Sequence, residues 1–151
     1  VSWWQMGSDI ISIAQFFPVT PEKLYAWFVD PEKFARWFFP DNCVLDEAQL
    51  ENAVGGRFYV RMHDEENIEL VAAGRVLAAE APRLLRFTWS WQTEGFRQNE
   101  TLVDVAIEAA KGGARLLIMH RHVITEENAM HLAGWQAALQ KLTALLQHGG
   151  D

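Results

Sequence analysis

The sequence predicts an α+β domain in which a curved antiparallel sheet packs against one long C-terminal helix. Apolar residues recur at spacings of three and four through residues 126–147, which is typical of an amphipathic helix. Short alternating segments fill residues 43–121 and indicate about six strands. Two short helices separate these strands from a first strand at residues 9–17. A sheet with one apolar face needs a cover, and the C-terminal helix is long enough to provide it.

The C-terminal helix has clear boundaries in the sequence. Thr125 precedes its acidic start and is a candidate N-cap, while Gly149 and Gly150 supply a stop. The apolar stripe of the helix consists of Leu132, Trp135, Leu139, Leu142 and Leu146. This stripe must face a core.

The segment after the first strand contains the signal for a helix start twice. Thr20-Pro21 and Asp30-Pro31 each place a capping side chain before a proline at the first helical position. The first helix presents Leu24, Trp27 and Phe28 on one face, and the second carries Phe34, Trp37 and Phe38 until Pro40 ends it. Two short amphipathic helices are therefore expected.

The strands between residues 43 and 121 are separated by turn residues at hairpin spacing. The turns are expected at Gly55-Gly56, residues 64–67, Ala81-Pro82, residues 91–95 and residues 111–113. The alternation predicts an apolar sheet face made of Phe58, Val60, Met62, Leu85, Phe87, Trp89, Trp91, Thr101, Val103, Val105, Ile107, Leu116, Ile118 and His120. Arg86, Asp104 and Arg121 fall on the opposite, solvent-facing side.

Composition and charge restrict the classes of partner. With 151 residues, half of them hydrophobic, the chain fits a single domain, expected over residues 8–148 behind an N-terminal extension of residues 1–7. A formal charge of -7 opposes binding to nucleic acid or to an anionic membrane face. No apolar run approaches the ~20 residues needed to cross a bilayer, so no membrane insertion is expected. Cys43 is the single cysteine, which excludes an intrachain disulfide and favours a cytoplasmic location.

The aromatic content favours a cavity inside the domain. Seven tryptophans and nine phenylalanines exceed what strand pairing requires, so the interior is either wide and aromatic or hollow enough to accept a ligand. For each wall residue taken singly, ordinary core packing is the alternative role. The residues expected to line the cavity are Trp37, Phe58, Val60, Leu85, Phe87, Trp89, Thr101, Val103, Leu116, Ile118, His120, His131 and Trp135.

His120 is the most interesting titratable residue, because the alternation directs it toward the expected cavity. A neutral imidazole there could hydrogen-bond a ligand or act as general base near pH 7. The alternative is a buried histidine satisfied by a neighbouring hydroxyl or backbone group. His131 precedes Trp135 by one helical turn, so it either approaches the same space or lies at a solvent-exposed rim.

Motifs of the common enzyme classes and cofactor sites are absent from the sequence. It contains no G-x-S-x-G, P-loop, H-E-x-x-H or G-x-G-x-x-G pattern. His120 and His122 form an H-x-H pair that the alternation places on one strand face, but zinc needs a third ligand and nothing in the spacing brings His63 or His131 to it. We therefore expect no metal and no cofactor. Cys43 has no placed base and is interpreted as a small hydrophobic residue.

Short motifs follow one another along the chain in a characteristic order. They are a first strand, Pro21-Glu22 with Trp27, Asp30-Pro31 with Trp37, Gly55-Gly56-Arg57-Phe58, Pro82 with Leu85 and Thr88-Trp89, residues 101–105, residues 113–120, and Gly134-Trp135 with Leu139 and Leu142. This order resembles the SRPBCC (START-like) superfamily over nearly the whole chain after about residue 8. Within it the sequence is most similar to the bacterial AHSA family, relatives of the activator of the heat-shock protein ATPase.

The resemblance implies a helix-grip fold, in which a curved antiparallel sheet of about six to seven strands wraps the C-terminal helix and leaves an apolar cavity between them. It does not imply one function, because the superfamily includes lipid and hormone binders, polyketide cyclases and self-sacrificing resistance proteins. Leu117 and Met119 replace polar residues usual in relatives, and Arg121-His122 replaces a small residue and a glycine. The Trp3-Trp4 extension has no counterpart in the family pattern.

Three functional hypotheses remain open on the sequence. The first is a cofactor-free protein that binds a small apolar or aromatic molecule, with His120 and Thr101 offering polar contacts. The second is an enzyme of cyclase, dehydratase or hydrolase type that uses His120 as acid or base. The third, suggested by the resemblance alone, is a co-chaperone-like activator of a heat-shock ATPase; it ranks last because the eukaryotic activator has an additional N-terminal domain that this sequence does not contain. A homodimer is left open.

Overall fold

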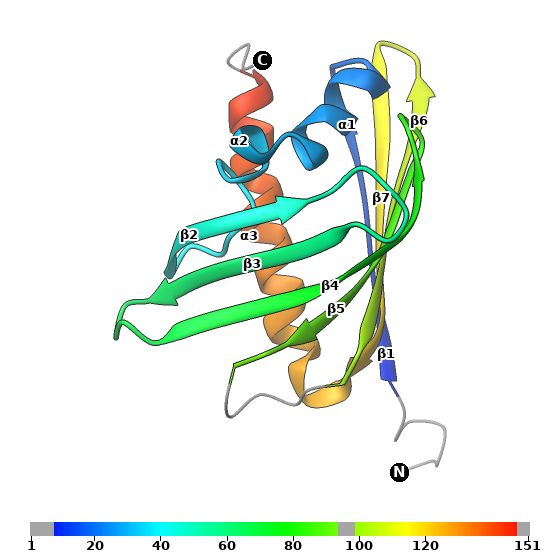
Figure 1. Cartoon of the computed structure of the whole chain (residues 1–151). Helices are drawn as coiled ribbons and strands as arrows, with labels where there is room; N and C mark the ends of the chain where they lie inside the picture. The colour runs from blue at the N-terminus through cyan, green and yellow to red at the C-terminus, as the bar shows by residue number, and fades with distance from the viewer. Residues whose placement is uncertain (1–7, 94–98, 148–151) are drawn as a thin grey trace.

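The computed structural model describes residues 8–93 and 99–147 (Figure 1). The elements, in chain order, are β1 (Ser8–Phe17), α1 (Pro21–Val29), α2 (Pro31–Phe34), β2 (Cys43–Leu50), β3 (Arg57–Asp64), β4 (Glu69–Glu80), β5 (Leu84–Trp91), β6 (Thr101–Ala110), β7 (Gly113–Ile124), the 3-10 turn η2 (Thr125–Glu127) and α3 (Asn128–Gln147). The Trp3-Trp4 extension, part of the expected turn at residues 91–95, and the Gly149-Gly150 stop lie outside the described residues.

The strands form one 7-stranded antiparallel sheet in the order β1-β7-β6-β5-β4-β3-β2. Figure 1 shows the sheet curling around α3: β2, β3 and β4 cross the helix on one side, while β1, β6 and β7 run alongside it. The predicted α+β helix-grip architecture is thereby confirmed, including the two short helices after the first strand.

Close contact between β4 and β5 at Gly74 contributes to the curvature of the sheet. A Cβ atom at Gly74 would lie 1.8 Å from the carbonyl oxygen of Thr88 on β5, so any larger residue would collide with backbone. The register of the same strand pair shifts between Val76 and Ala78. A tight approach followed by an irregularity bends the strand, as β-bulges do.

The two short helices begin where the sequence predicts. The Thr20 hydroxyl accepts a hydrogen bond of 3.2 Å from the backbone N–H three residues on, and the Asp30 carboxylate accepts one of 3.0 Å from the N–H two residues on. Helix α2 ends at Phe34, so it is shorter than the sequence suggests. Trp37 and Phe38 therefore lie in the turns that lead toward β2.

The C-terminal helix begins with the 3-10 turn η2. The residue at the N-cap position of η2 is Ile124, which makes no side-chain capping hydrogen bond, and the predicted cap residue Thr125 is the first residue of this turn. Helix α3 then continues to Gln147. The predicted stripe faces the sheet: Trp135, Leu139, Leu142 and Leu146 are buried, and Leu132 is partly buried against the core.

Strand β7 contains a bulge that changes the direction of its side chains. Asp9 and Ile11 on β1 are two residues apart, whereas their partners Val123 and His120 are three apart. His122 lies in this bulge with φ of 66° and is exposed, whereas His120 is fully buried. The two histidines do not share a face, so the interpretation of an H-x-H pair on one strand face is wrong.

Aromatic side chains fill the end of the concavity that α1 and α2 cover. Trp27 and Trp37 are fully buried, and the indole N–H of Trp37 donates a hydrogen bond of 2.9 Å to the carbonyl oxygen of Trp27. The rings of Phe28 and Phe34 pack edge-on against Trp37, with centroids 4.9 and 5.7 Å away. This end of the concavity is therefore solid core.

Candidate ligand cavity

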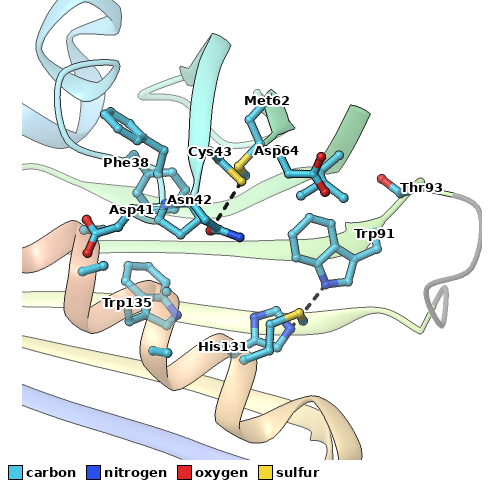
Figure 2. A pocket seen from close by; sticks show the side chains of 18 of the residues that line it. Phe38, Asp41, Asn42, Cys43, Met62, Asp64, Trp91, Thr93, His131 and Trp135 are labelled. Atoms are coloured by element: carbon cyan, nitrogen blue, oxygen red, sulfur yellow. Dashed lines mark hydrogen bonds between the residues drawn. The ribbon is translucent and has the colours of Figure 1, made fainter. Parts of the chain in front are cut away.

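A cavity of about 730 Å³ lies between the first half of α3 and the ends of strands β2 to β5. It is lined by Phe38, Phe39, Pro40, Asp41, Asn42, Cys43, Met62, Asp64, Ile68, Leu70, Trp89, Trp91, Thr93, Met130, His131, Ala133, Gly134, Trp135, Ala137 and Ala138. Figure 2 shows side chains of the helix, among them His131 and Trp135, facing those of the strands, among them Cys43 and Met62.

Four mutually supporting aromatic side chains form the apolar wall. Phe38, Trp89, Trp91 and Trp135 all line the cavity and are otherwise buried. The ring centroids are 5.7 Å apart for Trp89 and Trp91, 5.9 Å for Phe38 and Trp89, and 5.4 Å for Phe38 and Trp135. Aromatic rings in such contact keep their positions, so the wall is pre-formed rather than assembled by a ligand.

The cavity exists because α3 presents small residues to this part of the sheet. Ala133, Gly134, Ala137 and Ala138 all line it. A Cβ atom added at Gly134 would meet nothing within 4 Å, so the space beside the helix is open there. The following turns of α3 carry the buried leucines of the stripe. The change from small to large residues along one helix thus divides the cavity from the filled core.

His131 lines the cavity and forms a hydrogen bond with Trp91, another wall residue (Figure 2). The indole N–H of Trp91 donates to Nε2 of His131 at 3.4 Å, and the two rings stack with centroids 5.9 Å apart. Because Nε2 accepts, we assign the proton of the neutral ring to Nδ1. Burial lowers the pKa of His131 to about 4. Glu127, whose Oε1 lies 3.8 Å from Nε2, is therefore not an ion-pair partner of His131 at neutral pH.

His120 lies behind the cavity wall, with hydrogen bonds to both ring nitrogens. The indole N–H of Trp135 donates to Nδ1 at 3.1 Å. Nε2 lies 2.7 Å from the hydroxyl of Thr101, whose own proton is donated to the carbonyl oxygen of Trp89 at 2.9 Å. Since the hydroxyl proton is used, the hydroxyl accepts from Nε2–H, and the neutral ring is fully satisfied. Burial, and next the neighbouring His131, lower the pKa of His120 to about 3.

Two carboxylates, Asp41 and Asp64, stand on the polar side of the cavity. Lys141 Nζ donates to Asp41 at 2.7 Å and to the carbonyl oxygen of Phe39 at 3.0 Å, which ties the segment before β2 to α3. Asp64 Oδ1 accepts backbone N–H groups of two residues in the β3–β4 turn, at 3.0 and 2.9 Å. Asp64 therefore shapes the turn while leaving charge beside the cavity.

Cys43 also lines the cavity, where it begins β2. Burial raises the pKa of its thiol, and the charges of Asp64 and Glu65 raise it further. The thiol is protonated at neutral pH and is a poor nucleophile, in agreement with the interpretation of Cys43 as a small hydrophobic residue.

Of the residues that the sequence predicts as cavity lining, three line this cavity: Trp89, His131 and Trp135. The other predicted residues lie in the core without reaching its wall, namely Trp37, Phe58, Val60, Leu85, Phe87, Thr101, Val103, Leu116, Ile118 and His120. Two of them, Thr101 and His120, support wall residues through the hydrogen bonds described above. The expected direct contact of these two residues with a ligand does not follow from this arrangement.

Sequence reasoning missed the segment from Phe38 to Cys43, the ends of β3 and β4, and the small residues of α3. Loop residues follow no periodicity, so the sequence held no signal for the first group. The run of alanine and glycine at residues 133–138 was a usable signal, because small residues on the sheet-facing side of a helix leave space that the opposite strands must fill.

Metal-ligating side chains do not converge in the part of the chain that the structure describes. No group of three or more histidine, cysteine, aspartate or glutamate side chains in residues 8–93 and 99–147 is placed to hold an ion. Nδ1 of His63 lies 3.0 Å from a carboxylate oxygen of Asp46. Within the same described residues, no helix combines the length and the apolar character that crossing a bilayer requires.

Comparison with known proteins establishes the family. The family model described as Activator of Hsp90 ATPase homolog 1-like protein matches residues 18–147. The chain belongs to this family. The resemblance to the AHSA family and its superfamily is thereby confirmed, and the matched range includes every element from α1 to α3.

Solved structures similar to this AHSA1-like chain share its fold over nearly its whole length. The AHSA1 protein from Silicibacter pomeroyi is 28% identical, with a TM-score of 0.82 over 93% of this chain and 99% of that one. A protein from Chromobacterium violaceum is 23% identical, with a TM-score of 0.81 over 91% and 96%. CalU16 from Micromonospora echinospora is 23% identical, with a TM-score of 0.70 over 92% and 76%. The sequence has no significant match among curated proteins.

Proposed function

We propose that this AHSA1-like protein binds a small, largely aromatic molecule, without a cofactor, in the cavity between α3 and the sheet. The observation that carries the proposal is the cavity of about 730 Å³ with its wall of Phe38, Trp89, Trp91 and Trp135. Ligand pockets typically measure roughly 300–1,000 Å³ and are lined by hydrophobic and aromatic side chains with few polar groups. With Cys43 as the single cysteine, the cytoplasm is the location we propose.

Binding is favoured over the acid–base enzyme because of the state of His120. Both of its ring nitrogens are engaged, with Trp135 and Thr101, and the ring is fully buried behind the wall. A general base must reach the proton that it abstracts, directly or through one water. His120 would have to break its hydrogen bonds and change position to do so.

Filling the cavity from the helix side tests the proposal. Gly134→Leu places a side chain in the open space beside α3 and also replaces glycine in a helix interior, which stabilises by up to about 1 kcal/mol. Ala144→Leu, on the exposed face of the same helix, is the matched control. Thermal unfolding is followed with and without neutral aromatic compounds such as 1-naphthalenemethanol and flavone. A compound at 100 times its Kd stabilises the folded state by about 2.7 kcal/mol.

We expect a saturable rise in Tm for the wild type and for Ala144→Leu, and a clearly smaller rise for Gly134→Leu, although Gly134→Leu unfolds at the same temperature as the wild type or higher. An undiminished rise in Gly134→Leu would place the ligand outside this cavity. The absence of any rise in the wild type across the aromatic compounds would contradict the proposal.

A further inference from the structure

A second, polar cavity of about 410 Å³ adjoins the aromatic cavity. It is lined by Asp41, Asn42, Cys43, Val44, His63, Asp64, Glu65 and Asn67. Four of these residues, Asp41, Asn42, Cys43 and Asp64, also line the aromatic cavity, so the two spaces meet along the start of β2 and the end of β3. An aromatic chamber therefore opens beside an acidic one.

The charges around this junction are almost all negative. Three carboxylates line the two cavities, and among the described residues neither lining contains lysine or arginine. Lys141 offsets Asp41, at 2.7 Å. Within residues 8–93 and 99–147, Asp64 and Glu65 form no ion pair with a cationic side chain. Within the part of the chain that the structure describes, Asp64 and Glu65 thus leave negative charge without a cationic partner where the two cavities meet.

The thiol of Cys43 lies in the electrostatic field of the same two carboxylates. It lies on the shared wall, and after burial the two causes that raise its pKa are the charges of Asp64 and Glu65. An anionic group that entered the aromatic cavity past this wall would meet the same repulsion. A cationic group would be attracted there, and aromatic faces such as Trp91 attract cations as well.

We infer that the ligand of this protein is an organic cation, whose aromatic body occupies the chamber lined by Trp89, Trp91 and Trp135 and whose ammonium group lies beside Asp64. The inference rests on the proposed binding function and adds the charge of the ligand. Figure 2 shows the arrangement that it requires, with Asp64 and Met62 across the cavity from His131 and Trp135.

The test uses three probes that share one aromatic body and differ in charge: 1-naphthylmethylamine, which is protonated at neutral pH, 1-naphthalenemethanol, and 1-naphthaleneacetate. Their Kd values are measured by isothermal titration calorimetry at low ionic strength. We expect the amine to bind about fivefold more tightly than the alcohol, and the acetate to bind most weakly, since partly exposed charge pairs contribute up to about 1 kcal/mol. In about 1 M salt, where the Debye length is about 3 Å, the difference between amine and acetate should shrink.

A variant without the Asp64 charge tests whether the preference for the amine comes from this carboxylate. Asp64→Asn keeps an oxygen that can accept the two turn N–H groups, so the β3–β4 turn is preserved while the charge is lost. Glu108→Gln removes an equal charge from an exposed position on β6 that lines neither cavity. The preference for the amine over the alcohol should fall to about twofold or less in Asp64→Asn and stay unchanged in Glu108→Gln.

The outcomes separate this inference from the function on which it rests. Equal affinity for amine and alcohol, or tighter binding of the acetate, overturns the cation assignment while the cavity remains a binding site. An amine preference that falls equally in Glu108→Gln and Asp64→Asn also overturns it, because the effect would come from the net charge of the chain. If none of the three probes binds, the binding function and the inference both fail.

Discussion

The indole N–H of Trp135 on α3 donates a hydrogen bond of 3.1 Å to Nδ1 of His120 on β7. The bond is one link in a buried chain, because His120 continues to the hydroxyl of Thr101 and the hydroxyl continues to the carbonyl oxygen of Trp89. These hydrogen bonds connect α3 to β7, β6 and β5 in turn. Buried polar networks of this kind are costly when broken, so they favour a single position of the helix against the sheet.

Thr101→Val is expected to destabilise the fold although it preserves the shape of the side chain. The change removes the hydroxyl that accepts from His120 and donates to Trp89, and it leaves the buried Nε2–H of His120 unpaired. We expect a loss of about 1–3 kcal/mol in the free energy of unfolding, measured by urea denaturation. Thr101→Ser, which keeps the hydroxyl, should lose clearly less. A Thr101→Val protein as stable as the wild type would show that the chain of hydrogen bonds contributes nothing.

The two buried histidines predict a loss of stability on mild acidification. Burial lowers the pKa of His120 to about 3 and that of His131 to about 4, whereas an unfolded histidine titrates near 6.5. Below about pH 6.5 the unfolded chain takes up protons that the folded chain does not, so the free energy of unfolding falls as the pH falls. The contribution of the two neutral histidines to stability is complete above about pH 6.5, and it is lost as the pH falls from there toward their pKa values in the folded state. Each histidine should cost about 2 kcal/mol between pH 7 and pH 5.

Variants at His131 and at Trp91 test whether protonation of His131 causes this loss of stability. His131→Phe removes one titrating group, so the loss between pH 7 and pH 5 in urea denaturation should shrink by about 2 kcal/mol. Trp91→Phe removes the hydrogen bond to His131 but keeps the group, so it should lower stability at both pH values and leave the difference nearly unchanged. If His131→Phe showed the full wild-type loss, protonation of His131 would not be its source.

The sequence predicted the fold well because the relevant patterns are local. The prolines that follow Thr20 and Asp30 mark helix starts, and the glycines near residues 55 and 112 mark hairpins, whatever the rest of the chain does. The bulge at His122 was missed because a single extra residue leaves the alternation before it intact. The start of the C-terminal helix was predicted one residue late, because the 3-10 turn η2 already includes Thr125.

The position of the cavity was not predictable in the same way. Alternation separates the inner face of the sheet from the outer face, but it does not tell which inner residues meet a leucine of α3 and which meet an alanine. Phe87 and Trp91 lie on the same face of β5, yet Phe87 is core and Trp91 lines the cavity. That distinction depends on how α3 lies across the curved sheet, which is a tertiary property.

The burial of Asp104 on the outer face of the sheet was not predictable from the alternation either. The alternation predicts an exposed residue, but its side chain is 10% exposed, because Arg86 and Arg121 cover it. Arg86 Nε and Nη2 donate to the two carboxylate oxygens at 2.7 and 3.3 Å, and Arg121 Nη2 lies 3.5 Å away. A carboxylate beside two arginines is neutralised there, which makes its burial tolerable.

Asp104→Asn should therefore weaken the sheet at the β5–β6–β7 junction while leaving the shape of the side chain unchanged. Arg86 is 40% exposed, so water screens the pair, and we expect a loss of about 1–2 kcal/mol in the free energy of unfolding, not the larger cost of breaking a fully buried pair. The loss should decrease in about 1 M salt, where the Debye length is about 3 Å. Glu108→Gln is the control. Glu108 lies on β6, as Asp104 does, and forms an exposed ion pair of 3.9 Å with Arg115 on β7, so the change should alter stability by less than about 0.5 kcal/mol. The free energies of unfolding of both variants are measured by urea denaturation at low and high salt. Equally small losses in the two variants would mean that the two arginines cover Asp104 without stabilising the sheet.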